Sequence, residues 1–192
     1  MAYHDVTGVL LVGGASSRFG SPKTVAVFEG EMLAERAYRI IEDSFPNAIA
    51  VGKAEDMFPL SFEVLDDGSE LRAAIVGVAA ALRLADTEIA VAVPTDMPLL
   101  TPAALRLLAD AAAGYDAAVP QTGPLPGAYR RAALPVLERR IAGSQLALRD
   151  ALAELETHEI ALNPELLRNV NTRDDLEELA RSPGRRGKRT MS

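Results

Sequence analysis

A glycine-rich loop with two basic side chains is the part of this sequence best suited to chemistry. It reads Val12-Gly-Gly-Ala-Ser-Ser-Arg-Phe-Gly-Ser-Pro-Lys23. Adjacent glycines let the backbone approach a ligand closely, and successive N–H groups in such a loop can form an anion-binding nest. Arg18 supplies a planar fork of donors, Lys23 a mobile point charge and Ser16 a hydroxyl, all suited to phosphate oxygens. We interpret the loop as a cradle for a triphosphate.

The spacing of this loop excludes two common phosphate-binding motifs. A Walker A loop needs four residues between its glycines and a lysine directly after the second. Here five residues separate Gly14 from Gly20, and Ser21-Pro22 precedes Lys23. The dinucleotide-binding pattern G-x-G-x-x-G is excluded because Gly13 and Gly14 are adjacent. A glycine turn with incidental surface bases is the alternative, which two cations on one loop disfavour.

One carboxylate stands where it could hold a metal ion. Asp96 comes just after a buried apolar run, residues 88–93. Mg²⁺ usually takes one or two protein carboxylates together with substrate phosphate oxygens and water. A magnesium ion there would lie beside the cationic loop and neutralise charge developing at a phosphate. The alternative is that Asp96 caps a turn or the helix after Thr101.

Two amide side chains near the carboxyl end are a second candidate ligand group. Asn169 and Asn171 flank Val170, so on an extended segment both side chains point the same way. They could bind a base edge or a sugar hydroxyl, or position a metal-bound water. The alternative for Asn171, together with Thr172, is to cap a helix over residues 173–180.

The elements that position these residues alternate between short apolar runs and helical patterns. We expect strands at 7–12, 48–51, 62–65, 88–93, 116–119 and 157–162, and helices at 31–44, 71–84, 101–113, 132–141, 145–155 and 173–180. Thr101 is a natural N-cap with Pro102 at the first helical position. The alternation predicts an α/β fold whose parallel-rich sheet is covered by helices on both faces. Such sheets bind ligands outside the carboxyl ends of their strands.

The amino-acid composition limits the classes of protein to which this chain can belong. The chain has 192 residues, of which 48% are hydrophobic and 24% charged, as expected for one globular domain. It has no cysteine, which excludes disulfides, thiolate nucleophiles and cysteine-based zinc sites. Only two histidines occur, so a histidine-rich metal site is excluded as well. No run of about 18 apolar residues predicts a membrane span, and the amino end lacks signal-peptide character, so we expect a cytoplasmic location.

The charge is distributed unevenly between the body of the chain and its last twelve residues. Its formal net charge is -7, yet five bases and no acid lie in the last twelve residues. An otherwise acidic body repels phosphate backbones, so nucleic-acid binding by the folded part is not expected. The tail has no apolar periodicity, which predicts a disordered basic extension. We therefore expect one folded domain over residues 1–180 and a disordered basic tail over residues 181–192.

These motifs resemble a known family. The run Leu11-Val-Gly-Gly-x-Ser-x-Arg-Phe-Gly-x-x-Lys23 resembles the signature loop of the molybdenum cofactor guanylyltransferases, which belong to the wider nucleotidyltransferase group. The resemblance continues at Pro94-Thr-Asp-Met-Pro98, at Leu125-Pro-Gly-Ala-Tyr-Arg-Arg131 and at Asn169-Val-Asn-Thr172. Order and spacing match from about residue 7 to residue 180.

The resemblance implies a fold, a reaction and a set of site residues. The implied fold is the three-layer, Rossmann-like fold of nucleotide-diphospho-sugar transferases. The implied reaction transfers GMP from GTP to the phosphate of a molybdenum-bearing pterin and releases pyrophosphate. Arg18 and Lys23 are then expected to stabilise the pyrophosphate, and Asp96 to hold Mg²⁺. The implied nucleotide-binding residues are Leu11, Val12, Gly13, Gly14, Ser16, Arg18, Gly20, Lys23, Gly77 and Asn171. The implied partners are GTP, the molybdopterin acceptor and maturation proteins that deliver the acceptor or receive the product.

One departure from the family keeps alternatives open. The family carries Gly-Pro-Leu-x-Gly before the helix that backs the base, whereas this chain has Ala73-Ala-Ile-Val-Gly77. The methyl groups of Ala73 and Ala74 narrow the space for a base or ribose. One alternative is a nucleotidylyltransferase of the same fold that uses CTP or a sugar phosphate. A second alternative, a non-catalytic nucleotide-binding regulatory protein, is disfavoured because Arg18, Lys23 and Asp96 are all present.

Overall fold

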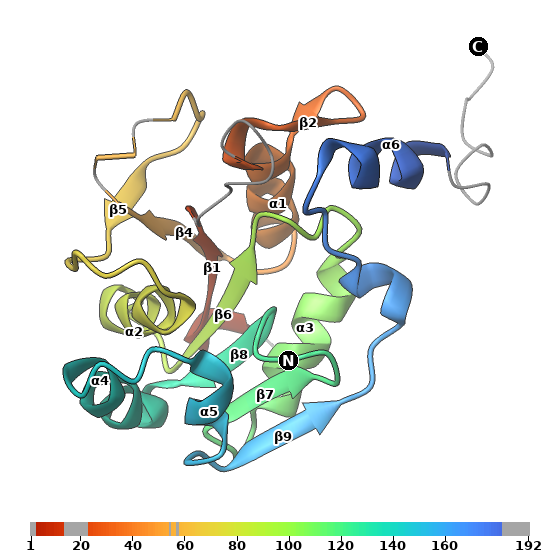
Figure 1. Cartoon of the computed structure of the whole chain (residues 1–192). Helices are drawn as coiled ribbons and strands as arrows, with labels where there is room; N and C mark the ends of the chain where they lie inside the picture. Colours follow the sequence, from red (N-terminus) through yellow and green to blue (C-terminus); the bar gives the residue numbers. More distant parts are fainter. Residues whose placement is uncertain (1–2, 14–22, 54, 57, 182–192) are drawn as a thin grey trace.

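A seven-stranded sheet lies at the centre of the molecule (Figure 1). The computed structural model describes residues 3–13, 23–53, 55–56 and 58–181. The strands of this sheet are β1 (Val6–Leu11), β4 (Asn47–Gly52), β5 (Val64–Asp66), β6 (Ile89–Pro94), β7 (Ala117–Pro120), β8 (Gly127–Arg130) and β9 (Thr157–Ile160). Their order is β5-β4-β1-β6-β8-β7-β9, and every neighbouring pair is parallel except the two that include β8. The predicted α/β fold with a mostly parallel sheet is therefore confirmed.

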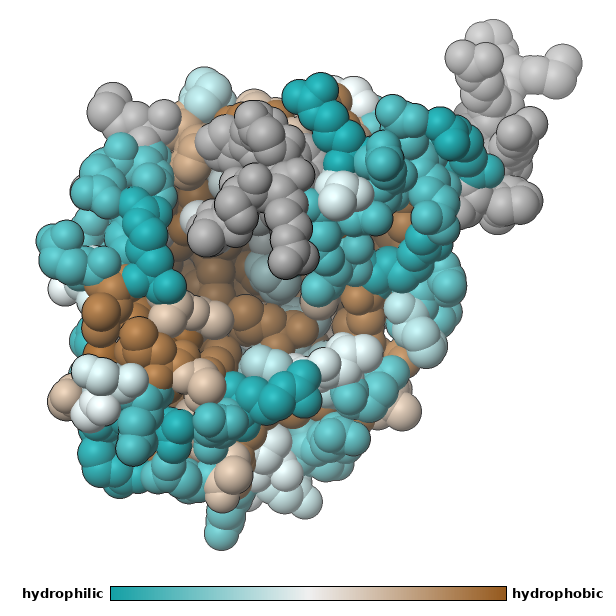
Figure 2. All heavy atoms as spheres, in the orientation of Figure 1, coloured by the Kyte–Doolittle hydropathy of each residue, from teal (hydrophilic) through white to brown (hydrophobic). Residues whose placement is uncertain are grey.

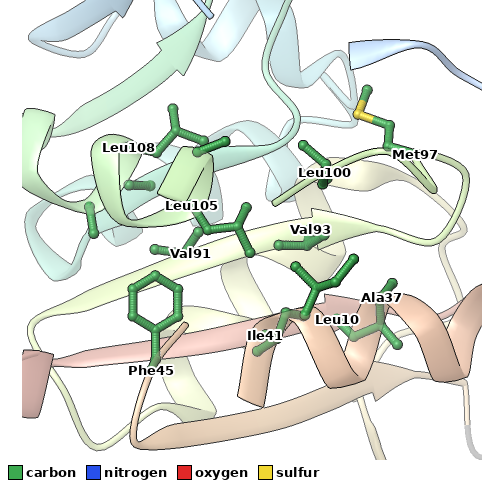
Figure 3. Packing of buried hydrophobic residues seen from close by; sticks show 14 of the residues in the cluster. Leu10, Ala37, Ile41, Phe45, Val91, Val93, Met97, Leu100, Leu105 and Leu108 are labelled. Atoms are coloured by element: carbon green, nitrogen blue, oxygen red, sulfur yellow. The ribbon is translucent and has the colours of Figure 1, made fainter. Parts of the chain in front are cut away.

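Helices cover both faces of the sheet. They are α1 (Leu33–Glu42), α2 (Ala74–Leu84), α3 (Pro102–Ala111), α4 (Leu134–Ala142), α5 (Leu148–Leu152) and α6 (Arg173–Arg181). On one face α1 and α3 pack on Leu10 and Val93, as Figure 3 shows. On the other face α2, α4 and α5 pack on Val9 and Ala92. Successive residues of a strand point to opposite faces, so a strand buried on both sides must be apolar at nearly every position.

Local signals account for several of these elements. The near-continuous apolar runs of β1 and β6 are the central parallel strands, as their composition predicts. The Thr101 side chain accepts a hydrogen bond from the Ala104 N–H at 3.3 Å, with Pro102 at the start of α3. The predicted helix start is thus confirmed, and it places α3 directly after the turn that carries Asp96.

Other predicted boundaries are wrong, and each has a tertiary cause. The helix predicted over 71–84 begins only at Ala74, because the carbonyls of Ser69 and Leu71 accept hydrogen bonds from the Lys53 ammonium group. The helix predicted over 145–155 shortens to α5, because residues 145–147 form a non-helical link between α5 and the turn that ends α4 at Gly143-Ser144. The strand predicted over 62–65 is shifted to β5 by its parallel pairing with β4.

A small hairpin was not predicted from the sequence. Strands β2 (Val27–Phe28) and β3 (Glu31–Met32) follow a short 3₁₀ helix, Lys23–Val25, and pair antiparallel. Two-residue strands are too short for an alternating pattern to mark them. The turn between them, Glu29-Gly30, has positive φ at both residues, as a type I′ hairpin turn requires. The hairpin packs with α6 around Phe28 and Val170, so the segment that follows Lys23 meets the carboxyl-terminal helix there.

The last predicted helix, over residues 173–180, is α6, which ends one residue later. Helix α6 includes Arg181, whose guanidinium pairs with the Glu177 carboxylate at 2.6 Å. The rest of the predicted tail lies outside the described residues. Across the described part of the chain, no helix is both long and apolar enough to cross a membrane.

Candidate active-site cleft

A cleft of about 380 Å³ opens where the carboxyl ends of β1, β4 and β6 meet the amino end of α2. Figure 2 shows it as a hollow with an apolar floor and a hydrophilic rim. The floor includes Leu11, Val12, Val51, Ala73 and Leu125. The cleft therefore lies at the edge of the sheet where the strand pattern predicts a ligand site, and its floor offers an apolar surface for a planar ring.

Several of the predicted site residues are brought together here. Leu11, Val12, Gly13, Gly77 and Asp96 all line the cleft, although they come from three distant segments of the chain. Gly13 has φ near +114°, a conformation that glycine adopts at little cost. A Cβ at Gly77 would lie 3.2 Å from Leu11 Cδ2, so this glycine allows α2 to pack closely against β1.

The structure describes only the two ends of the predicted phosphate loop. Gly14, Ser16, Arg18 and Gly20 lie outside the described residues. The backbone of Lys23 begins a 3₁₀ helix whose next residue, Thr24, is buried and lines the cleft. The role of the loop in binding phosphate therefore stays a prediction, with its two ends at Gly13 and Thr24 on the cleft.

Asp96 lies half-buried in the turn that follows β6. Its backbone carbonyl accepts a hydrogen bond from the Val170 N–H at 2.8 Å, which brings Asn169 and Asn171 beside this turn. Neither asparagine is among the residues that line the cleft. Contact of the two asparagines with nucleotide or metal therefore stays a prediction. The structure shows that their segment is joined to the Asp96 turn by the backbone hydrogen bond of Val170.

The structure shows the helix capping that was the alternative role for Asn171 and Thr172. The Asp175 carboxylate accepts hydrogen bonds from the N–H groups of Asn171 and Thr172, at 2.7 and 2.8 Å. The Thr172 hydroxyl accepts one from the Asp175 N–H at 3.1 Å. These reciprocal bonds form a capping box at the start of α6. Capping by Thr172 is compatible with a ligand role for the Asn171 side chain.

A buried ion pair that the sequence did not point to forms one wall of the cleft. The Lys53 ammonium group donates to Asp67 Oδ1 at 2.8 Å, to the Leu71 carbonyl at 2.7 Å and to the Ser69 carbonyl. Both charged side chains are more than 90% buried. An ammonium group has three donors, so all three are used within this wall. Lys53 thus holds the segment that leads into α2, and Lys53 follows β4 just as Asp96 follows β6.

A second ion pair closes the rim near Gly13. The Arg72 guanidinium donates to Asp56 at 2.7 Å and to Glu55 at 2.6 Å. The hydrogen bond from Arg72 holds the pKa of the Asp56 carboxyl below its usual range, and the two carboxylates raise the pKa of Arg72. The stabilising contribution of Asp56 is therefore present at neutral pH and is lost only as the pH falls through its lowered pKa.

The two alanines that depart from the family pattern stand at the start of α2. Ala73 is the N-cap residue, with φ −147° and ψ 149°, and its side chain makes no capping hydrogen bond. Ala74 is the first helical residue, a position where proline is also well accommodated. The first N–H groups of a helix have no intrahelical acceptor. The amino end of α2 therefore presents donors and the positive end of its dipole at the cleft.

We expect Lys53→Met to destabilise the protein strongly. The substitution leaves the Asp67 carboxylate buried without its counter-ion and releases the carbonyls of Ser69 and Leu71. Breaking a buried ion pair in this way should lower the free energy of unfolding by about 3 kcal/mol, measured by urea denaturation.

The double variant Lys53→Met/Asp67→Asn provides the control, because it removes the orphaned charge while keeping the side-chain shape. It should recover about half of the lost stability. Equal losses in the single and double variants would show that the buried charge is not the cause.

The donor set of the cleft fits a hard cation that is shared with a substrate. Asp96 offers a carboxylate just after β6, on the lining of the cleft. Among the described residues, no group of three or more His, Asp or Glu side chains could hold a metal ion by itself. One carboxylate with phosphate oxygens and water is the arrangement typical of Mg²⁺, so Asp96 suits a metal that arrives with a nucleotide.

Comparison with known proteins identifies the family of this sequence. Residues 8–160 match the model of the MobA-like NTP transferase domain. The chain is 32% identical to the probable molybdenum cofactor guanylyltransferase of Bacillus subtilis, with 91% of this chain and 96% of that protein covered. It is 31% identical to the protein of the same description from Chloroflexus aggregans, with 90% and 92% covered.

A solved structure agrees with these matches. The fold is similar to that of molybdopterin-guanine dinucleotide biosynthesis protein A from Archaeoglobus fulgidus, with a TM-score of 0.78 and 26% sequence identity. The superposition covers 90% of this chain and 96% of that one. The resemblance inferred from the loop, the Asp96 turn and the Asn171 segment therefore extends over nearly the whole fold.

Proposed function

This chain belongs to the family of MobA-like NTP transferases, and we propose that it is a guanylyltransferase of molybdenum cofactor biosynthesis. It transfers GMP from GTP to the phosphate of a molybdenum-bearing pterin and releases pyrophosphate. The observation that carries this proposal is the cleft where Gly13, Gly77 and Asp96 meet, together with relatives that bear this activity in their names.

The cleft offers separate surfaces for the parts of a nucleotide. The apolar floor, with Leu11, Val51 and Leu125, suits a base or ribose. The loop that leaves the cleft at Gly13 and returns at Thr24 carries Arg18 and Lys23, which we assign to the triphosphate. The α-phosphate then lies between the loop and Asp96, at the carboxyl ends of the central strands.

The reaction needs positioning and charge neutralisation rather than a strong base. An oxygen of the acceptor phosphate, already an anion near neutral pH, attacks the α-phosphorus of GTP. The bond from that phosphorus to the oxygen that bridges the α- and β-phosphates breaks, and pyrophosphate leaves. A magnesium ion at Asp96 would supply charge neutralisation on the phosphates. Arg18 and Lys23 hold the departing pyrophosphate, and oriented binding supplies most of the remaining acceleration.

A second candidate, transfer from CTP, is favoured by one observation. Ala73 and Ala74 line the cleft at the positions that correspond to the Gly-Pro of the family, so these two alanines border the space proposed for the base. A smaller pyrimidine ring would tolerate this narrowing better than a purine. The partners proposed with either reaction are the nucleotide, the pterin acceptor and maturation proteins that exchange acceptor and product with this chain.

Thermal denaturation with nucleotides tests the proposal and separates the candidates. GTP at about 100 times its Kd should add about 2.7 kcal/mol of stability, and Mg²⁺ should increase the effect. CTP and ATP should stabilise less. Stabilisation by CTP alone would favour the second candidate, and equal stabilisation by all three nucleotides with no turnover would favour a regulatory protein.

A further inference from the structure

An arginine outside the cleft holds the turn that carries Asp96. Arg36 lies on α1, and its Nε–H donates to the backbone carbonyl of Pro98 at 2.8 Å. Pro98 is two residues beyond Asp96, in the turn between β6 and α3. The Arg36 side chain is only 17% exposed, so this contact is partly buried.

An aromatic ring and two carboxylates orient the guanidinium of Arg36. Its Cζ lies 5.3 Å from the centre of the Phe28 ring, and Phe28 is almost fully buried. Its two terminal nitrogens lie 3.4 Å from Glu29 Oε2 and 3.5 Å from Glu31 Oε2. An aromatic face and two carboxylates leave the planar group little freedom, so the Nε–H is directed at the Pro98 carbonyl.

The Asp96 turn is therefore anchored from two sides. Arg36 holds Pro98 from α1, and the Val170 N–H holds the Asp96 carbonyl from the segment before α6. Phe28, Val170 and neighbouring apolar residues form one cluster beneath these contacts, with Leu99 of the same turn packed against it. The backbone on both sides of the Asp96 side chain is thus tied to one small apolar core.

The same cluster also holds the returning end of the phosphate loop. The Leu33 N–H at the start of α1 donates to the Ala26 carbonyl at 2.8 Å. Ala26 directly follows the 3₁₀ helix that begins at Lys23. One helix therefore contacts both the segment that follows Lys23 and, through Arg36, the turn that bears Asp96.

We propose that Arg36 is a positioning residue for nucleotidyl transfer, which fixes the Asp96 turn relative to the Lys23 segment so that metal and triphosphate bind at a set separation. The inference rests on the proposed function, but the anchoring of the turn can be measured without it. Arg36 touches neither nucleotide nor metal in this account and acts through the Pro98 carbonyl. Groups that orient metal ligands in this indirect way affect metal affinity about 10- to 100-fold.

A matched control exists elsewhere in the chain. Arg106 of α3, like Arg36, donates to backbone carbonyl oxygen: its acceptors are the carbonyls of Ser44 and Asp43, at 3.1 and 2.6 Å. Its Cζ lies 6.0 Å from the centre of the Tyr3 ring. Arg106 thus shares with Arg36 a hydrogen bond to backbone carbonyl oxygen and an aromatic neighbour, but it lies near the opposite ends of the strands, away from the cleft.

The experiment compares Arg36→Met with Arg106→Met by hydrogen exchange and by GTP binding with and without Mn²⁺ as a spectroscopic substitute for Mg²⁺. In Arg36→Met, the amides of Val170 and Leu100 should exchange faster, and Mn²⁺-dependent GTP binding should weaken about 10-fold. GTP binding without metal should change by less than about 2-fold, since the apolar floor of the cleft is intact. Arg106→Met should leave these two amides and the metal-dependent binding unchanged.

Each outcome decides the proposal. Unchanged exchange at Val170 and Leu100 in Arg36→Met, or the same loss of metal-dependent binding in Arg106→Met, would overturn it. Faster exchange with normal Mn²⁺-dependent binding would overturn the role in metal positioning. If Arg36→Met does not fold, Arg36→Lys, which keeps the charge but not the planar fork, is expected to show the same pattern at smaller amplitude. Wild-type protein that binds no GTP would instead contradict the proposed function.

Discussion

Asp96→Asn is expected to lower kcat/KM for guanylyl transfer about 10³-fold while the protein remains folded. The substitution keeps the side-chain shape but removes the charge on which binding of a hard cation depends. The rate should no longer rise with Mg²⁺ over the range that activates the wild type. GTP binding without metal should tighten slightly, because a carboxylate no longer repels the triphosphate.

The control for Asp96→Asn is an aspartate-to-asparagine substitution just before β6, at the end of this strand away from the cleft. Asp86 is exposed and precedes β6, so Asp86→Asn removes one charge far from the cleft. Steady-state rates across a magnesium titration should match the wild type for Asp86→Asn. If Asp96→Asn also kept the wild-type magnesium dependence, Asp96 would be a structural residue of its turn, since asparagine caps as well as aspartate.

Lys23→Ala is expected to reduce turnover to a similar degree. The lysine ends the glycine-rich loop, and its predicted task is to stabilise charge on the departing pyrophosphate. Removing one such electrostatic contact typically lowers the rate about 10²- to 10³-fold. The melting temperature should change little, because the predicted task of this lysine is to bind phosphate and not to pack in the core.

Lys188→Ala is the matched control for the lysine. It removes the same group from the basic tail, which we expect to play no part in catalysis. Pyrophosphate release, followed with a coupled assay, should be near the wild-type rate for Lys188→Ala. A folded Lys23→Ala variant that also releases pyrophosphate at the wild-type rate would refute the phosphate role.

Local chemistry explains which parts of the fold could be predicted. The central strands β1 and β6 are continuous apolar runs, and the start of α3 carries a capping threonine followed by proline, so each is marked by its own residues. The position of Asp96 follows from the same logic, because a residue directly after a central parallel strand must lie at the edge where the other strands end.

Contacts between distant residues explain what could not be predicted. Lys53 and Asp67 form a pair only because β4 and β5 lie side by side, and the same pair delays the start of α2 to Ala74. The anchoring of the Asp96 turn by Arg36 depends equally on the packing of α1. The sequence did contain a sign that Lys53 lies at the site: it is a charged residue directly after a parallel strand, β4, just as Asp96 closely follows β6.

The transfer of label from nucleotide to acceptor tests the central claim most directly. Purified protein, Mg²⁺ and the molybdenum-bearing pterin phosphate are incubated with GTP or CTP labelled at the α-phosphate, and both product and pyrophosphate are measured. We predict that label from GTP appears on the acceptor with one pyrophosphate released per transfer, and that CTP is a much poorer donor. Binding of GTP without any transfer of label, or equal transfer from CTP, would contradict this account.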